Sequence, residues 1–130
     1  MSLTSNTQIV SPSTGARNIQ ATPNATADNA VVSGTVYINS VVIDNTNNAS
    51  ADSFFKCWDA SAPTVGTTVP SFVFKVGGAE KLYINFQKNR PKFTTALSFA
   101  CVTAGGTGGT TSPSSSVSIG MVVQGADDAV

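Results

Sequence analysis

Six short apolar runs, rich in valine, isoleucine and aromatic residues, constrain the fold of this 130-residue chain more than any other feature. β-Branched and aromatic side chains favour strands, and clusters of Asn, Gly, Ser and Pro separate the runs. The predicted strands cover residues 31–44, 53–58, 71–76, 81–86, 93–102 and 117–123. No stretch shows the periodicity of a helix. We therefore predict an all-β fold: an antiparallel, jelly-roll-like β-sandwich preceded by a flexible polar N-terminal arm.

The second run, residues 53–58, shows how the strands should divide their side chains between two faces. Because side chains alternate along a strand, Phe54, Lys56 and Trp58 are expected on one face, and Phe55 and Cys57 on the other. A single tryptophan beside a lysine could serve as a sugar-stacking or cation–π site. We favour the alternative, in which Trp58 closes one end of the β core.

The connection between the second and third runs contains Pro63, Gly66 and Pro70. Each proline fixes φ near about −65° and lacks an N–H donor, which favours an extended segment. Gly66 allows a turn or a close backbone approach. We expect this stiff segment to carry the chain from one sheet of the sandwich to the other. The residues expected to set chain direction or fill the core here are Trp58, Pro63, Gly66, Pro70, Phe72 and Phe74.

Composition divides the chain into three parts. Residues 1–26 are small and polar, with too few large side chains to pack a core, which predicts either a mobile tail or an arm that becomes ordered along a neighbouring subunit. Residues 27–123 form the predicted sandwich, and residues 124–130 a short tail. Within the sandwich, residues 103–116 are almost wholly Gly, Thr, Ser and Pro, and we interpret them as a long exposed hairpin loop.

The first residues show no basic segment followed by an apolar one, so no signal peptide is expected. No run approaches the roughly 18 apolar residues of a membrane span. We therefore expect a soluble protein that is made in the cytoplasm.

Charge is sparse and balanced along the chain. Charged residues make up 11% of the sequence, and seven basic residues balance seven acidic ones. No net field attracts nucleic acid or an anionic membrane, and such a surface suits a protein that works against other protein. The one basic cluster, Lys88, Arg90 and Lys92, lies in a predicted loop. These three residues, together with Ile9 and Val10 in the arm, are the candidates for a partner interface.

Catalytic chemistry is missing from the sequence. There is no histidine, which excludes Ser-His-Asp and Cys-His mechanisms and removes the commonest zinc ligand. Asp44 and Asp52 flank an Asn-rich loop and suggest a calcium site, but the spacing matches no calcium-binding loop, so solvated turn residues are favoured. We predict that the protein is not an enzyme and holds no metal or cofactor.

Two cysteines, Cys57 and Cys101, each lie within an apolar run. Buried thiols behave as small apolar side chains, and we favour two free thiols over a disulfide. A bridge stays open as an alternative if the two strands are adjacent and in register.

Several segments resemble a widespread family of small structural proteins of tailed bacteriophages. The strand ending in Lys-Cys-Trp-Asp at residues 56–59 leads into Ala-Pro-Thr-Val-Gly-Thr at residues 62–67, which is the most specific match. Residues 93–100, Phe-Thr-Thr-Ala-Leu-Ser-Phe-Ala, also resemble a strand of the family, with Ala96 where glycine is usual. The resemblance covers about residues 27–123. It implies a β-sandwich virion component without catalytic residues.

The resemblance favours a capsid cement (decoration) protein on the outer capsid surface, assembled in the host cytoplasm. Its expected partners are the major capsid protein and further copies of itself, as a homotrimer or homodimer. The alternative is a host-recognition module of a tail or head fibre that binds glycans through Trp58 or Tyr83. A head-completion or neck component is a third hypothesis.

Overall fold

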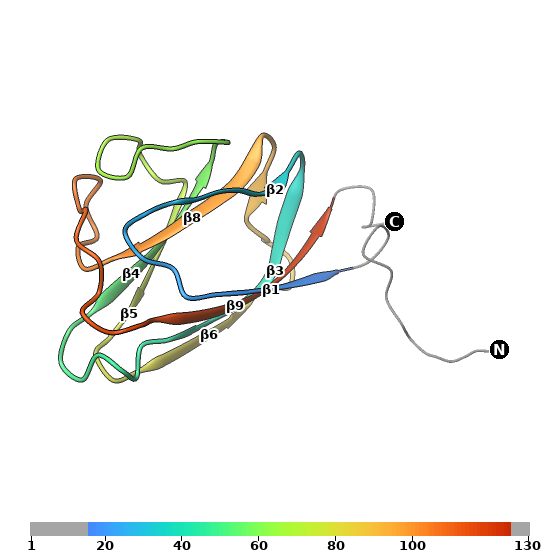
Figure 1. The fold of residues 1–130 in the computed structure, drawn as a ribbon. Coiled ribbons are helices and arrows are strands. Elements are labelled where there is room, and N and C mark those ends of the chain that lie inside the picture. Colours follow the sequence, from blue (N-terminus) through green and yellow to red (C-terminus); the bar gives the residue numbers. More distant parts are fainter. Residues whose placement is uncertain (1–15, 126–130) are drawn as a thin grey trace.

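The computed structural model describes residues 16–125, and every regular element within them is a β-strand. In order these are β1 (Arg17–Ala21), β2 (Asp28–Ser33), β3 (Val36–Asp44), β4 (Ser53–Asp59), β5 (Phe72–Val76), β6 (Lys81–Asn85), β7 (Lys92–Phe93), β8 (Ala96–Val102) and β9 (Ser118–Gly125). They form two antiparallel sheets packed against each other (Figure 1), which confirms the predicted β-sandwich. No helix that could cross a membrane occurs between residues 16 and 125.

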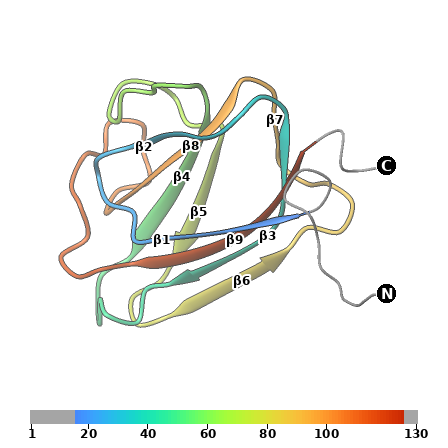
Figure 2. The ribbon, with the colours of Figure 1, turned by 45° about the vertical axis from the view of Figure 1, so that its right-hand side comes forward.

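The strand order is that of a jelly roll. Sheet A has the order β1-β9-β3-β6, with the two-residue β7 also paired to β3, and sheet B has the order β2-β8-β4-β5. Apart from β4–β5 and β6–β7, successive strands lie in opposite sheets, so the chain repeatedly crosses the top or bottom of the sandwich (Figure 2). Apart from the two-residue β7, each sheet has four strands, and sheets connected in this way form the double Greek key of jelly-roll domains.

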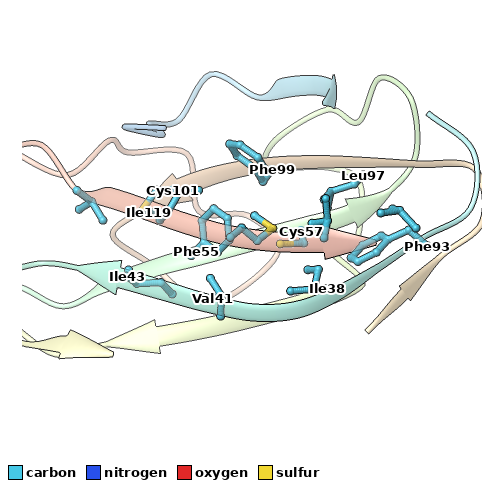
Figure 3. Close-up of a cluster of buried hydrophobic side chains, with 14 of the residues drawn as sticks. Ile38, Val41, Ile43, Phe55, Cys57, Phe93, Leu97, Phe99, Cys101 and Ile119 are labelled. Carbon is cyan, nitrogen blue, oxygen red and sulfur yellow. The ribbon is translucent and has the colours of Figure 1, made fainter. Parts of the chain in front are cut away.

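The core fills the space between the two sheets (Figure 3). Phe55 of β4 is fully buried, and its ring centroid lies 5.3 Å from that of Phe99 and 6.3 Å from that of Phe74. Phe72 packs against Phe93 at 5.4 Å. Burying one such side chain contributes about 1.5–3 kcal/mol, so these contacts hold the sheets together. The predicted core positions of Phe72 and Phe74 are therefore confirmed, although both rings are only partly buried.

The predicted boundary between arm and sandwich at residue 26 is wrong. Arg17–Ala21 forms β1, which pairs with β9 along its whole length. Ile19 and Ala21 point inward and pack against the core. A five-residue strand with two apolar side chains carries too weak a periodicity to be recognised in a polar segment. The sandwich also ends later than predicted, because β9 continues to Gly125.

The first predicted strand, residues 31–44, consists of two strands in different sheets. β2 ends at Ser33 and β3 begins at Val36. Gly34 lies between them with a φ of 83°, a left-handed conformation that glycine adopts readily. Its N–H donates to the carbonyl of Thr95 at 2.9 Å. The run of β-branched residues continues through this turn, so composition alone does not reveal the break.

The predicted roles of two long connections are reversed in the structure. β4 and β5 are neighbours in sheet B, with Phe55 opposite Phe74, so the proline-bracketed segment forms a long hairpin loop and not a crossover. Residues 103–116, predicted to be a hairpin loop, lie instead in the connection that carries the chain from β8 in sheet B to β9 in sheet A. Proline and glycine mark where a strand stops, but the sheet in which the next strand lies depends on long-range pairing.

Candidate functional site

The outer face of sheet B is covered by two loops, residues 60–71 and 103–111, which together we call the lid. The two loops lie side by side at one end of the molecule in both ribbon views, the first drawn in green and the second in orange (Figures 1 and 2). Beneath them lie the outward side chains of β4, and Trp58 is only 1% exposed. The Trp58 indole N–H donates to the carbonyl of Thr68 at 2.8 Å. This sheet face is therefore a second, smaller core.

The first lid loop is a compact turn and not the extended segment that was predicted. The carbonyl of Thr64 accepts hydrogen bonds from the N–H groups of Thr67 and Thr68, at 3.1 and 2.9 Å. Gly66 has a φ of 95°, and a Cβ there would lie 2.5 Å from Cγ2 of Thr110 in the second lid loop. Glycine is thus required at the point where the two lid loops meet, as the sequence suggested. Pro63 is buried, and Pro70 precedes β5.

Trp58 does not occupy its predicted place at the end of the main core. It is buried, but on the outside of sheet B, opposite Ser98 of β8 and beneath the lid. Its ring is covered and its N–H is already bonded, so it offers no surface to a sugar or a cation. Of the two aromatic residues considered for glycan binding, the accessible one is Tyr83, which is 61% exposed.

Lys56 lies beside Trp58 and ties β4 to the lid. Its side chain is fully buried, and Nζ donates to the carbonyl of Gly106 at 2.6 Å. Burial disfavours the charged ammonium and lowers the pKa of Lys56 below its usual 10.5. This lysine therefore acts inside the molecule and not at a partner interface.

The predicted basic interface residues are only partly available to a partner. The Arg90 guanidinium lies 4.5 Å from the centroid of the Tyr37 ring and donates to Oδ1 of Asn39 at 2.8 Å. The Lys92 ammonium lies 5.8 Å from the same ring. Lys88 is exposed in the loop after β6. The cluster is thus anchored on Tyr37 of sheet A by cation–π contacts, and Arg90 helps to fold its own chain.

The other two predicted interface residues, Ile9 and Val10, lie outside the described residues. The same is true of most of the predicted arm, up to residue 15. Their proposed contact with a neighbouring subunit stays a prediction.

The two suggested calcium ligands, Asp44 and Asp52, contact different partners in the structure. Asp44 accepts hydrogen bonds from the N–H and the hydroxyl of Thr46 and lies 3.7 Å from Nζ of Lys81. These contacts, the bonds from Thr46 first, lower the pKa of Asp44. Asp52 instead pairs with Lys75 at 3.5 Å. Within residues 16–125 no group of three or more acidic, cysteine or histidine side chains could hold a metal ion.

Both cysteines are buried free thiols, as predicted. They lie on the adjacent strands β4 and β8, but the register places Cys57 opposite Phe99 and Cys101 opposite Phe55. Burial raises the pKa of both thiols, that of Cys101 to about 12. The raised pKa disfavours the thiolate that a nucleophile or a metal ligand requires.

A shallow hollow of about 500 Å³, which we call the trough, lies on the outer face of sheet A. Its walls come from β1 and β6, where Asn18, Gln20 and Tyr83 point outward, and its floor comes from β9 and β3, where Gly120 and Val42 point outward. In contrast to sheet B, no lid covers these side chains among the described residues.

Of the residues that line the trough, only Tyr83 and Asp44 were candidates from the sequence, Tyr83 for glycan binding and Asp44 as a calcium ligand. Asn18 and Gln20 lie in the segment that was assigned to the arm, so they had no predicted strand. Gly120 lies within the last predicted strand, and alternation alone would have placed it on the outer face, between the inward-facing Ile119 and Met121. The pairing of β1 with β9, which brings the two walls into one sheet, has no local signal.

Comparisons with known proteins provide no assignment for this fold or for its surfaces. No protein-family model matches the sequence, and neither the curated proteins nor the solved structures include a match to the chain.

Proposed function

We propose that this protein is a non-catalytic bacteriophage capsid cement protein that binds the outer capsid surface and clamps neighbouring major capsid proteins. The observation that carries the proposal is the resemblance of residues 54–70, with Ala-Pro-Thr-Val-Gly-Thr at residues 62–67, to small structural proteins of tailed bacteriophages. Jelly rolls occur in viral capsid domains and also in lectins, so the fold supports the proposal only by analogy.

The candidate contact with the capsid is the edge of sheet B at β5. This strand pairs with β4 on one side, and no described strand pairs with its other side. Two exposed apolar side chains lie on this strand or in the loop before it: Val73 on β5 is 41% exposed, and Val69 in the lid is 73% exposed. An open edge with exposed apolar side chains accepts a partner strand through main-chain hydrogen bonds, without any need for charge. That mode of binding suits a chain with no net charge.

The protein would stabilise the head by thermodynamic linkage, because it binds the assembled shell in preference to separated subunits. A protein that binds across the boundary between two capsid subunits has affinity for the assembled shell and none for separated subunits. Its binding therefore favours the assembled state, by about 2.7 kcal/mol per site when its free concentration is 100 times its Kd. A homotrimer or homodimer would place several β5 edges on the lattice at once and increase the avidity.

The test uses heads of the virus that encodes this chain, prepared without the protein and then mixed with it. We expect saturable binding and a rise in the temperature at which heads rupture. Val73→Lys places a charge on the proposed contact and should weaken occupancy by about 10-fold, the equivalent of about 1.4 kcal/mol. Tyr83→Ala, which removes an exposed aromatic side chain from the other sheet, is the matched control and should leave occupancy unchanged. Heads that take up no protein would contradict the proposal.

The position of the protein in the virion separates the cement role from its competitors. A density map of intact particles should show it on the shell. Density on a tail or head fibre would instead support the host-recognition hypothesis, and density at the neck a head-completion role. Deleting residues 1–15, which leaves β1 intact, tests the predicted arm, because unchanged occupancy would remove that segment from the mechanism.

A further inference from the structure

The trough on sheet A results from the order of side-chain sizes across four strands. The register places Gln20 opposite Gly120, Gly120 opposite Val42, and Val42 opposite Tyr83. Long side chains thus stand on the two edge strands, and short ones on the two central strands. With neighbouring strands about 4.8 Å apart, the two walls are about 14 Å apart at their backbones. The resulting channel is open along the strand direction and wide enough for an extended chain molecule.

Gly120 on the floor of the trough has no structural requirement for glycine. It lies within β9 and is not among the described glycines with a positive φ, and a Cβ built there meets no atom within 4 Å. A β-branched residue at this position would strengthen the strand, because glycine in a strand interior is unfavourable. Glycine at such a position often marks a place where a ligand approaches the backbone closely. The empty space above Gly120 is therefore available to a ligand.

The walls of the trough offer hydrogen bonds and one aromatic ring. Asn18 and Gln20 present side-chain amides from β1, and each amide has both a donor and an acceptor. Tyr83 presents an exposed ring from β6. The charged residues at one end, Asp44 and Lys81, lie 3.7 Å apart and offset each other. The site thus combines side-chain amides and an aromatic ring with apolar surface, and it carries no net charge.

We propose that the trough binds a neutral oligosaccharide. A sugar presents C–H groups that pack on the Tyr83 ring and hydroxyl groups that both donate to and accept from the amides of Asn18 and Gln20. The absence of a net charge does not favour an anionic polymer such as a nucleic acid. The volume of about 500 Å³ lies within the range of small-ligand sites, about 300–1,000 Å³. This site is on sheet A, away from the β5 edge. Sugar binding at the trough and capsid binding at β5 can therefore be tested independently.

The first experiment screens the full-length protein against a panel of neutral hexose and N-acetylhexosamine oligosaccharides. The tightest-binding oligosaccharide is then titrated into isotope-labelled protein and followed by NMR. We expect the largest amide shifts at Gln20, Val42, Tyr83 and Gly120, with small shifts on the lid and on β5. No binding across the panel, or shifts centred elsewhere, would overturn the proposal.

Two pairs of variants test the trough itself. Tyr83→Ala should weaken binding of the selected oligosaccharide by about 10-fold, and Tyr83→Phe, which keeps the ring, should change it less than about 3-fold. Gly120→Val should fill the floor and weaken binding by at least about 10-fold while leaving the unfolding midpoint unchanged or higher. Val73→Lys, on the other sheet, is the control and should bind as the wild type does.

One alternative occupant is a second copy of this chain. Sedimentation of wild type and Gly120→Val distinguishes it from a sugar. If Gly120→Val dissociates an oligomer, the trough is a protein interface and the carbohydrate proposal is wrong. Tight sugar binding by Gly120→Val would overturn the proposal equally.

Discussion

The outer faces of the two sheets differ although they are built by the same rule. On sheet B the outward side chains Phe54, Lys56 and Trp58 are covered by the lid. On sheet A the outward side chains Gln20 and Tyr83 border an open trough. In both sheets, side chains alternate between the main core and the opposite face. The difference lies in the connections: both lid loops start from strands of sheet B and fold back over it.

This difference shows that the side chains on one face of a sheet and the exposure of that face to solvent are determined separately. Alternation decides which side chains share a face, whereas loops that are distant in sequence decide whether water reaches them. Trp58 and Tyr83 are both outward-facing aromatic residues, yet one stabilises the fold and the other is available for binding. Matched substitutions on the two faces should therefore have different effects on stability.

The largest effect on stability is expected from truncating Trp58, and truncation of Tyr83 on the other face provides the comparison. Trp58→Ala leaves a cavity beneath the lid and should lower the free energy of unfolding by about 3–5 kcal/mol. Tyr83→Ala removes an exposed ring and should change it by less than about 1 kcal/mol. Urea unfolding of both variants measures the contrast. Equal losses would mean that the two faces are not distinct.

Replacing a glycine by alanine should also change stability in opposite directions on the two faces. Gly66→Ala forces a side chain into a positive φ and against Thr110, and should cost roughly 2 kcal/mol. Gly120→Ala meets open space and should be neutral or stabilising by up to about 1 kcal/mol. Thermal unfolding midpoints provide the comparison, and a destabilised Gly120→Ala variant would argue against an open trough floor.

A smaller and pH-dependent effect is expected at Asp59, where the lid begins. Its carboxylate accepts hydrogen bonds from the N–H groups of Thr94, Thr95 and Ala96. Desolvation alone would raise the pKa of Asp59, but these bonds outweigh it and lower the pKa below 3.8. Asp59→Asn should therefore cost about 1–2 kcal/mol at neutral pH.

The pH dependence of this effect has a defined sign. The folded protein holds the Asp59 proton less tightly than the unfolded chain, so its contribution is present above about pH 3.8 and is lost as the pH falls through the lower folded-state pKa. Chemical denaturation of wild type and Asp59→Asn from pH 7 to pH 2 should show their stabilities converging in acid. A constant difference would exclude the carboxylate as the cause.

The smallest effect is expected at Lys56. Lys56→Met keeps the buried stem and removes the charge, so stability at pH 7 should change by less than about 1 kcal/mol or increase. Because the pKa of Lys56 is lowered on folding, the unfolded chain binds more protons up to about pH 10.5, and wild-type stability should rise with pH. The advantage of Lys56→Met should therefore shrink between pH 7 and pH 10. A pH-independent difference would indicate that folding does not shift the pKa of Lys56.

The sequence predicted the division of faces correctly where alternation is clear. Phe55 and Cys57 lie in the main core, while Lys56 and Trp58 lie on the opposite face of sheet B. The prediction was wrong at β1, because a short polar strand has no apolar periodicity of its own. The prediction was also wrong at the two long connections, β4–β5 and β8–β9. Neither proline nor glycine content specifies the sheet to which the next strand belongs.

The trough shows the same limit of prediction from sequence. Tyr83 was named from the sequence as a candidate for glycan binding, but its partners Asn18 and Gln20 are more than sixty residues away in sequence. They join it in one sheet only through the pairings of β1 with β9, of β9 with β3 and of β3 with β6. No local pattern specifies such pairings, which depend on burying Ile19 and Ala21 against the common core.

By itself, the sequence determined the all-β class, the positions of most strands, the burial of both thiols and the need for glycine at residue 66. These properties depend on local preferences: β-branched and aromatic content, two-residue alternation and backbone freedom. Only the tertiary structure decided the jelly-roll strand order, the lid over Trp58 and the open trough beside Tyr83. The reason is that each of these depends on contacts between distant segments, where packing of the whole chain selects one arrangement among many that are locally equivalent.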